Sequence, residues 1–220
     1  MPGRQRPKPR LTKKGKKAQI LALVNAAKLA TNLLDDLKEW TTYNKHDMNL
    51  KVSFSNAKDL KTEEVNQIFD LLQKNMKDLY DKSDWGWNAD EKMSELTSDE
   101  ARFLVVKDSE DKLVGFTHFQ FDVETNYPVL YCYELQIESD YQRKGLGRFL
   151  MNILTLIAFK FKLVKVMLTV FTNNRAGINF YLKALQFRRD ETSPYEEEER
   201  CYIILCKFVD KNEVSNIKSI

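Results

Sequence analysis

The 220-residue sequence predicts a mixed α/β fold, and three features support this prediction. Short segments with alternating or continuous apolar residues are typical of β-strands. Longer segments with apolar residues three and four positions apart are typical of helices that bury one face. Between residues 129 and 171 the two patterns form one strand–helix–strand unit, which favours a parallel pair of strands joined by a helix. A mixed central sheet flanked by helices is therefore expected.

The first half of the chain alternates between helical and extended patterns. Thr62 is expected to cap the second helix because a hydroxyl side chain accepts hydrogen bonds from the first free N–H groups. The expected elements are an N-terminal helix at 18–40, a polar connector at 41–48, a strand at 49–55, a helix at 63–81, a loop or short helix at 83–92, and a hairpin of strands at 102–107 and 113–121.

The second half contains the strand–helix–strand unit and a closing hairpin. The strand at 164–171 is apolar almost throughout, which indicates burial on both faces. The expected elements are a strand at 129–137, a helix at 147–161, a strand at 164–171, a helix at 174–185, and a hairpin near 187–191 and 201–208.

The composition excludes several classes of protein. With 43% hydrophobic and 30% charged residues, the chain has the composition of a soluble globular protein. No apolar run reaches the roughly 18–20 residues that a membrane span needs, so no membrane association is expected. Cys132, Cys201 and Cys206 form no CxxC pair, and the two histidines are far apart in sequence. We therefore expect neither a disulfide scaffold nor a metal site, and a reducing compartment.

Charge is distributed unevenly along the chain. Residues 1–17 contain eight Lys or Arg and no acid, and the remaining residues contain 27 basic against 32 acidic side chains. We expect residues 1–17 to be a disordered basic tail. Three roles are open for it: a nuclear localisation signal, a weak contact with DNA or RNA, or solubilisation. Residues 196–199 are four consecutive Glu, which form either a solvated face or a surface that attracts a basic partner.

The most informative segment is the loop between the strand at 129–137 and the following helix. It contains the pattern Gln142-x-x-Gly145-x-Gly147, with additional positive charge nearby. Glycine permits close approach of the backbone, and the free N–H groups of a helix N-terminus bind anions such as phosphate. The spacing does not match a dinucleotide fingerprint or a P-loop. Taken alone, the motif is equally consistent with a tight turn.

The order strand, Gln-x-x-Gly-x-Gly, helix and buried strand resembles the acetyl-CoA site of the GNAT superfamily of N-acetyltransferases. The segment Asn174-x-x-Gly177-x-x-x-Tyr181 is similar to the Asn-x-x-Ala-x-x-x-Tyr of that superfamily. The resemblance covers roughly residues 50–208 and implies a GNAT fold that uses acetyl-CoA as cosubstrate. The residues that it implies for acetyl-CoA binding are Leu135, Gln136, Ile137, Gln142, Arg143, Lys144, Gly145, Leu146, Gly147, Arg148 and Asn174.

Six blocks in order resemble one family within this superfamily, N-terminal acetyltransferase D (NatD). They are LYDKSDWGWN (79–88), HFQFDVE (118–124), VLYCYELQIES (129–139), RKGLGRFL (143–150), KVMLTVF (165–171) and ALQF (184–187). The resemblance implies acetylation of the N-terminal α-amine of histones 4 and 2A, in the nucleus and cytoplasm, by a monomer. The expected organisation is a basic tail at 1–17, a helix and connector at 18–48 packed on the domain, an acetyltransferase domain at 49–208, and a C-terminal tail at 209–220.

Glu134 is the first candidate for the general base. It lies in a strand that otherwise looks buried, where a carboxylate is costly unless it is functional or paired. An ion-paired core glutamate is the alternative. The resemblance implies a β-bulge in this strand, which would bring Tyr133 and Glu134 toward one site and free a strand N–H near Leu135 or Gln136 for the thioester oxygen.

Tyrosines complete the set of candidate catalytic residues. Tyr133 and Tyr80 are candidates beside Glu134. The superfamily pattern implies that Tyr181 protonates the departing thiolate. The segment YLKALQF is one residue longer than usual between Tyr181 and Phe187 and lacks the usual Gly, so a core tyrosine that points elsewhere is the alternative.

The NatD resemblance also implies a substrate pocket lined by aromatic residues. Asp122 is expected to accept a cationic or amino group, and Thr169 to bond peptide backbone, although an ordinary strand residue is an equal alternative for Thr169. Such a pocket suits a small first residue followed by Arg and Lys. The implied substrate-binding residues are Tyr80, Trp85, Asp122, Tyr131, Tyr133, Thr169 and Tyr202.

Two other functions remain open from the sequence. A GNAT enzyme that acetylates lysine side chains would need a stronger base, since the pKa of Lys is near 10.4. A chromatin-binding module without catalysis would act through residues 1–17, because the rest of the chain carries a net charge of −5.

Overall fold

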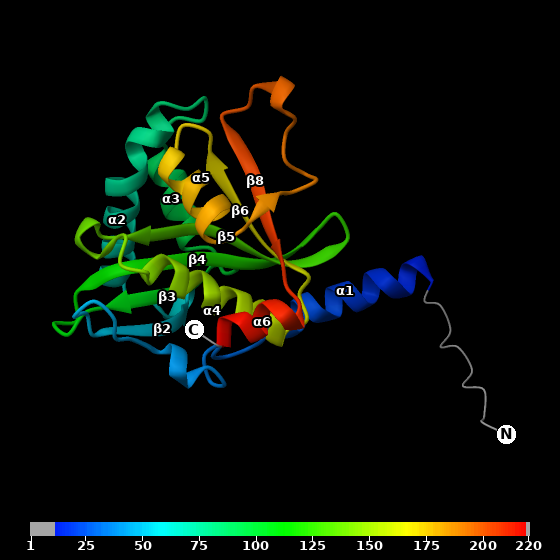
Figure 1. Ribbon diagram of the computed structural model, residues 1–220, viewed down its shortest axis with the longest axis horizontal. Helices are drawn as coiled ribbons and strands as arrows, with labels where there is room; N and C mark the ends of the chain where they lie inside the picture. Colours follow the sequence, from blue (N-terminus) through cyan, green and yellow to red (C-terminus); the bar gives the residue numbers. More distant parts are fainter. Residues whose placement is uncertain (1–11, 219–220) are drawn as a thin grey trace.

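The computed structural model describes residues 12–218, which form an eight-stranded sheet with helices on both faces (Figure 1). The strand order is β1-β2-β3-β4-β5-β6-β8-β7; β5 and β6 are parallel, and all other neighbours are antiparallel. The strands are β1 (Thr42–Tyr43), β2 (Leu50–Asn56), β3 (Arg102–Lys107), β4 (Leu113–Glu124), β5 (Tyr127–Ile137), β6 (Lys165–Phe171), β7 (Arg188–Arg189) and β8 (Tyr202–Phe208). The helices are α1 (Lys13–Lys28), α2 (Thr62–Asp81), α3 (Ala89–Leu96), α4 (Leu146–Lys160), α5 (Arg175–Asn179) and α6 (Lys211–Lys218), with a π-helical turn at Phe180–Ala184 and short 3₁₀ turns at Lys38–Trp40, Ala57–Asp59, Ser139–Tyr141 and Glu196–Glu198.

In the described part of the chain the sheet separates two large apolar cores, beside a small cluster of Val129, Met167 and Cys206. Helices α1, α4 and α6 pack on one face, and α2 and α3 pack on the other. Strand β3 contributes to both cores, because successive side chains of a strand point to opposite faces of the sheet. Leu104 and Val106 join the first core, while Phe103 and Val105 join the second. The predicted mixed α/β sheet with flanking helices is confirmed.

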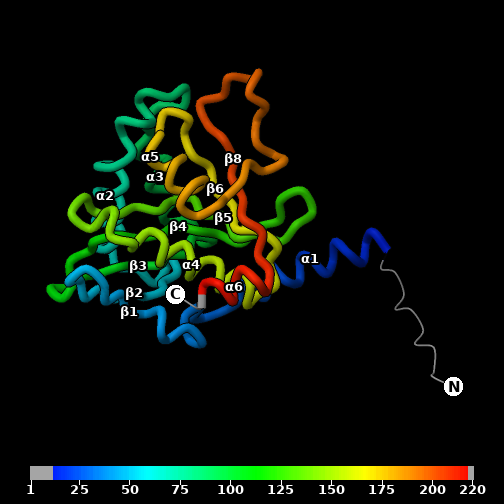
Figure 2. The backbone as a smooth tube through the Cα atoms, in the orientation of Figure 1, coloured from blue at the N-terminus to red at the C-terminus, as the bar shows by residue number. Residues whose placement is uncertain are grey.

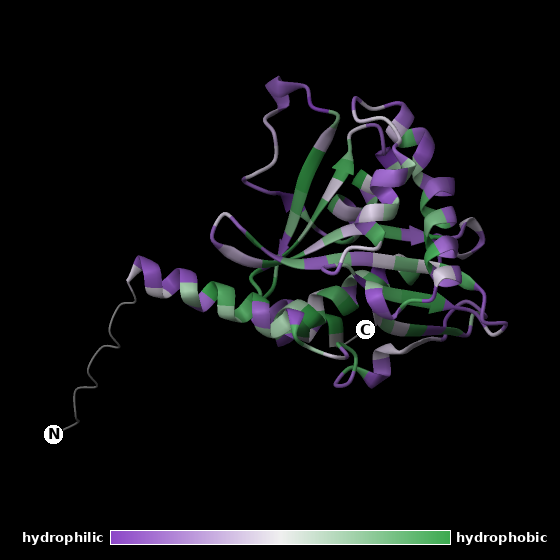
Figure 3. Cartoon of the chain, turned by 180° about the vertical axis from the view of Figure 1, so that it is seen from behind, coloured by the Kyte–Doolittle hydropathy of each residue, from purple (hydrophilic) through white to green (hydrophobic). Residues whose placement is uncertain are grey.

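The N-terminal helix differs from its predicted bounds. It begins at Lys13, where the hydroxyl of Thr12 accepts a hydrogen bond from the N–H of Gly15, and it ends at Lys28 instead of residue 40. Residues 13–17, predicted as disordered tail, are therefore helical, and residues 1–11 lie outside the described part of the chain. Viewed from behind, the hydrophilic start of α1 projects beyond the body of the protein (Figure 3).

Further elements differ from the sequence prediction, and one of them is the helix predicted at 174–185, which is α5 followed by the π-helical turn. The predicted connector 41–48 contributes the two-residue strand β1, which pairs with β2. The predicted C-terminal tail contains α6, which buries Val214 and Ile217 in the first core. The expected cap Thr62 is the first residue of α2, and Lys61 occupies the N-cap position.

Strands β5 and β6 separate along their length, and this gap positions the candidate site. Their pairing ends at Cys132 and Leu168, although β5 continues to Ile137 against β4 and β6 continues to Phe171 against β8. Residues 133–137 therefore lack a β6 partner, and a cavity of about 1040 Å³ opens at this place. Within residues 12–218, no helix combines the length and apolar character needed to cross a membrane.

Candidate active site

A β-bulge in β5 changes the face on which the candidate base lies. His118 of β4 pairs with Glu134, but the next residue, Phe119, pairs with Cys132, so Tyr133 is the extra residue of the bulge. A slip of one residue moves every following side chain to the other face of a sheet. Cys132 consequently points into the core beneath α4, whereas Glu134 shares the α2/α3 face with its neighbour His118. The structure thus contains the expected bulge, located at Tyr133.

Glu134 is buried and lines the cavity. One of its carboxylate oxygens accepts a hydrogen bond of 2.8 Å from the side-chain amide of Gln136, whose own carbonyl oxygen accepts one of 3.1 Å from Asn75. Burial raises the pKa of Glu134 to about 7, the hydrogen bond from Gln136 and the charge of Lys92 act to lower it, and Glu95 acts to raise it. A carboxyl group with a pKa near neutrality is suited to accept a proton at physiological pH.

Lys92 and Glu95 form an ion pair that the sequence did not single out. Both belong to α3, line the cavity and meet at 2.8 Å, and the Lys92 ammonium lies 4.7 Å from the centre of the Tyr80 ring. Burial acts to lower the pKa of Lys92, but the hydrogen bonds to Glu95 and Tyr80 outweigh it and leave that pKa above its ordinary value. The available sequence signal was the placement of a lysine on the apolar face of a short helix, four residues before Leu96.

The cavity tyrosines hold their protons at neutral pH. Burial raises the pKa of Tyr80 and of Tyr131 to about 12, and it raises that of Tyr133 from its ordinary value. Burial also raises the pKa of Tyr181 well above 10, with Cys132 and Glu134 adding to the effect. These phenols are therefore hydrogen-bond donors or acids at neutral pH. Of these four tyrosines and Glu134, it is Glu134 that exchanges a proton near pH 7.

A π-helical turn places Tyr181 in the cavity. The N–H of Leu185 bonds the carbonyl of Phe180, a five-residue step that absorbs one extra residue. Phe187 is still buried, and Gln186 takes the left-handed backbone conformation (φ 59°) that glycine adopts without strain. The long spacing and the missing glycine thus leave Tyr181 lining the cavity, with its ring packed against those of Phe180 and Phe187.

The glycine-containing loop forms the other wall of the cavity. Arg143 and Gly145 both have positive φ, 56° and 83°, which gives the loop a sharp turn immediately before α4. A side chain at Gly147 would meet the ring of Phe180 at 3.1 Å, so this glycine also allows α4 to pack against the π-helical turn. Of the predicted acetyl-CoA residues, those that line the cavity are Leu135, Gln136, Ile137, Gln142, Arg143, Gly145, Gly147 and Asn174.

Three predicted acetyl-CoA residues do not line the cavity. Leu146 is buried in the first core, and Lys144 and Arg148 are exposed. The carbonyl of Lys144 accepts a hydrogen bond from the hydroxyl of Tyr43 on the far side of the loop. These residues support the loop or lie on its outer surface.

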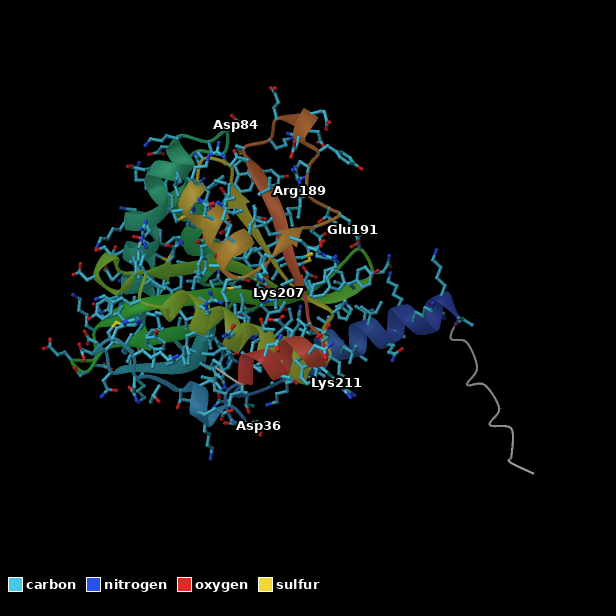
Figure 4. All side chains as sticks on the ribbon, viewed as in Figure 1. Asp36, Asp84, Arg189, Glu191, Lys207 and Lys211 are labelled. Atoms are coloured by element: carbon cyan, nitrogen blue, oxygen red, sulfur yellow. The ribbon has the colours of Figure 1, made fainter. Side chains whose placement is uncertain are left out.

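Aromatic rings surround the β5 end of the cavity. Tyr80, Trp85, Tyr131 and Tyr133 line it, and the hydroxyls of Tyr131 and Thr169 are hydrogen-bonded at 2.6 Å. The ring of Tyr202 lies 4.9 Å from that of Trp85, outside the cavity wall. The loop between α2 and α3, which carries Trp85, therefore lies beside the start of β8; Figure 4 shows its neighbour Asp84 at this end of the molecule.

The acidic groups near the cavity come from β4 and α3, and Asp122 has the exposed position that was predicted for it. Asp122 is exposed and accepts a hydrogen bond from the N–H of Val123, whereas Glu124 of the same strand lines the cavity together with Glu95. The charge of Asp122 still acts on Tyr133, whose pKa it raises. Alternation along β4 places Asp122 and Glu124 on one face, so Glu124 was predictable from the same pattern. In the part of the chain that the structure describes, no group of three His, Cys, Asp or Glu is placed to hold a metal ion.

This site has the parts that transfer of an acyl group to an amine requires. Glu134 can accept a proton, Tyr181 can donate one, and the loop before α4 presents backbone N–H groups to an anion. The unpaired edge of β5 beyond Cys132 offers further backbone groups to an extended ligand with amide bonds.

Solved structures of N-acetyltransferases have the same fold. The ribosomal-protein-S18-alanine N-acetyltransferase of Escherichia coli matches with a TM-score of 0.50 and 18% identity, covering 72% of this chain and 94% of its own. Ard1 of Thermoplasma volcanium matches with a TM-score of 0.52 and 15% identity, covering 73% and 99%. The PaiA N-acetyltransferase of Thermoplasma acidophilum, solved in complex with coenzyme A, matches with a TM-score of 0.51 and 16% identity, covering 72% and 99%.

A sequence model of the Acetyltransferase (GNAT) family matches residues 65–187, more than half of the chain. These residues include the bulged strand, the glycine-containing loop, α4 and the π-helical turn. The chain belongs to the GNAT acetyltransferase family.

Proposed function

We propose that this GNAT acetyltransferase transfers acetyl from acetyl-CoA to the free N-terminal amine of histones 4 and 2A. The observation that carries the proposal is the placement of Glu134 and Tyr133 by one bulge at the end of an aromatic pocket. The resemblance of six sequence blocks to the NatD family supports the same substrate. The same resemblance is the basis for proposing that the protein acts in the nucleus and cytoplasm.

Acetyl-CoA is the cosubstrate of GNAT enzymes, and the cavity suits its parts. The loop at 142–147 and the N-terminus of α4 are suited to the pyrophosphate, with Arg143 as a nearby cation. The open edge of β5 at 133–137 is suited to the amide groups of the pantetheine arm. An acetyl group carried along this edge would reach the bulge, where Glu134 lies.

The chemistry follows from the charge states of the site. Glu134 accepts a proton from the substrate ammonium, directly or through water, and the neutral amine attacks the thioester carbonyl carbon. The new C–N bond forms as the C–S bond breaks, and the departing thiolate takes the proton of the Tyr181 hydroxyl. The attacking nitrogen loses its second proton as the amide forms, and that proton restores the Tyr181 hydroxyl through solvent. An α-amine with a pKa of about 7.7–8.0 needs only a base whose pKa is near neutrality, and the pKa of Glu134 is about 7. A lysine side chain, with a pKa near 10.4, would need a stronger base.

The walls of the pocket favour a small first residue. Tyr80, Trp85, Tyr131 and Tyr133 are large and lie in two pairs, with ring centroids 5.1 Å apart for Tyr131 and Tyr133 and 6.4 Å apart for Tyr80 and Trp85. A bulkier first side chain would force them to move at roughly 1–3 kcal/mol. Glu124 lines the cavity, together with Glu95 in its ion pair with Lys92, and a following Arg or Lys that pairs with a carboxylate at this rim gains about 0–1 kcal/mol per exposed pair.

The test is a thiol-release assay with acetyl-CoA and three peptides that begin SGRGK, SGAGA and LGRGK, at low and high salt. We expect turnover of SGRGK at its α-amine, a salt-sensitive partial loss with SGAGA, and loss with LGRGK. Mass spectrometry of the product with a free or blocked N-terminus locates the acetyl group. Equal use of all three peptides, or acetylation of Lys, would contradict the histone N-terminal proposal but not the family assignment.

A further inference from the structure

The segment between α1 and β2 contacts the glycine-containing loop from the side opposite the cavity. Tyr43 of β1 is 3% exposed, and its hydroxyl donates a hydrogen bond to the carbonyl of Lys144, 101 residues away in the chain. Figure 2 shows this segment passing along the lower edge of the sheet, below α4. It precedes the part of the chain that the family model matches, residues 65–187.

Aromatic packing holds Tyr43 in place. Its ring meets Phe149, in the first turn of α4, edge to face with centroids 5.0 Å apart, and Trp40 stacks on Phe149 at the same centroid distance. The backbone of the segment is fixed as well, because Tyr43 pairs with Leu50 and the N–H of Val52 bonds the carbonyl of Thr41 at 2.7 Å. The hydroxyl is thus a fixed donor against the loop.

The hydrogen bond determines the orientation of one peptide group. In a planar trans peptide the C=O and the N–H point in opposite directions. Since the carbonyl of Lys144 points to Tyr43, the N–H of Gly145 in the same peptide points away from Tyr43. Gly145 lines the cavity and Tyr43 does not, so this N–H is directed to the cavity side.

The fit between Tyr43 and Gly145 is close. A side chain at Gly145 would place its Cβ 2.6 Å from the Tyr43 oxygen, and the backbone there has a φ of 83°. The tyrosine hydroxyl therefore occupies the space beside the glycine and restricts the loop to one arrangement.

We propose that Tyr43 is a positioning residue for acetyl-CoA, whose hydroxyl holds the Lys144–Gly145 peptide so that its N–H is directed at the pyrophosphate. The inference rests on the assignment of the loop to the pyrophosphate under the proposed function, and it is independent of the acyl acceptor. It makes the segment before β2 a part of the cosubstrate site.

The experiment compares Tyr43→Phe with the unchanged protein for two ligands, acetyl-CoA and S-acetylpantetheine, which lacks the pyrophosphate. Phe keeps the ring contacts and removes one hydroxyl. We expect acetyl-CoA binding, measured by calorimetry, to weaken about 3- to 10-fold, as the loss of one hydrogen bond predicts, with S-acetylpantetheine binding unchanged. The matched control is Tyr141→Phe, which removes a 3.2 Å hydrogen bond from the Tyr141 hydroxyl to Asp108 near the same loop and leaves the carbonyl of Lys144 untouched.

The binding data distinguish a wrong role for Tyr43 from a wrong assignment of the loop to the pyrophosphate. Equal weakening of both ligands, or the same loss in Tyr141→Phe, would show a purely structural role for Tyr43. If the unchanged protein binds both ligands equally tightly, the pyrophosphate assignment itself is wrong. Gly145→Ala provides a second measurement: it should weaken acetyl-CoA binding by a smaller factor in the Tyr43→Phe background, because the closest contact of the new methyl group is gone. Additive losses would overturn the proposed contact.

Discussion

Replacing Glu134 with Gln is expected to abolish most activity and, at the same time, to stabilise the protein at alkaline pH. Burial raises the pKa of Glu134 from 4.5 to about 7. Between these two values the folded state binds more protons than the unfolded chain, so the free energy of unfolding falls as the pH rises through that window. At about 1.4 kcal/mol per pH unit, the ionised carboxylate costs roughly 3 kcal/mol of stability above pH 7.

Glutamine removes this cost while it keeps the shape of the side chain. Its carbonyl oxygen can still accept the hydrogen bond from Gln136, and it carries no charge to bury. The variant should therefore exceed the parent in unfolding free energy by roughly 3 kcal/mol at pH 8 and by little at pH 4.5. Burial lowers the pKa of the neighbouring His118 to about 3, so its protonation destabilises the fold as the pH falls below 6.5. That contribution is common to both proteins and cancels in the difference.

The assay is urea unfolding of both proteins at intervals between pH 4.5 and pH 8, together with thiol release at the same pH values. The variant should lose roughly 10²–10⁴ in kcat, the range of general-base contributions, and the parent kcat/KM should rise with pH through about 7. A stability difference that is the same at every pH would refute the raised pKa of Glu134. Full activity in the variant would remove Glu134 from the mechanism.

Three further predictions concern neighbouring groups. Glu95→Gln should move the midpoint of the kcat/KM pH profile down, and Lys92→Met should move it up, because Glu95 raises the pKa of Glu134 and Lys92 lowers it. Equal shifts in one direction would contradict this. Gln186→Gly should raise the free energy of unfolding by about 1 kcal/mol without changing kcat, since φ is 59° at this position; thermal unfolding measures it, and no gain would refute the strain. Lys165→Met should destabilise the protein by about 3–5 kcal/mol, because the buried carboxylate of Asp190 lies 2.7 Å from the Lys165 ammonium and would lose that partner. Adding Asp190→Asn should recover part of that loss in urea unfolding. A further loss would show that the ion pair is not the cause.

The elements that local patterns specify strongly were predictable from the sequence. The strand predicted at 102–107 matches β3 at both ends, and the helix predicted at 147–161 is displaced by one residue from α4. In both, the period of the apolar residues matches the geometry of the element, because one face or both faces are buried in a core. The glycine-containing loop was visible for a similar reason, since a turn into a helix restricts the residue types at adjacent positions.

The face of the sheet that receives Glu134 depended on the tertiary structure. Simple alternation groups Glu134 with Cys132, and only the pairing of β5 with β4 shows that Tyr133 is inserted between them. A bulge is a property of two strands, so the sequence of one strand does not determine it. The π-helical turn is similar, because burial of Phe187 and the position of Tyr181 together select the five-residue step.

The sequence by itself determined the strands other than β1, the helices α2 and α4, the loop before α4 and the resemblance to a family of acetyltransferases. Only the tertiary structure brought Lys92 and Glu95 to the cavity and the hydroxyl of Tyr43 to the loop. The physical reason is range. The period of the apolar residues and the residue types of a turn depend on a few neighbouring positions in the sequence. The charge beside a buried carboxylate and the donor behind a loop come from segments tens of residues away, which meet only when the sheet has formed.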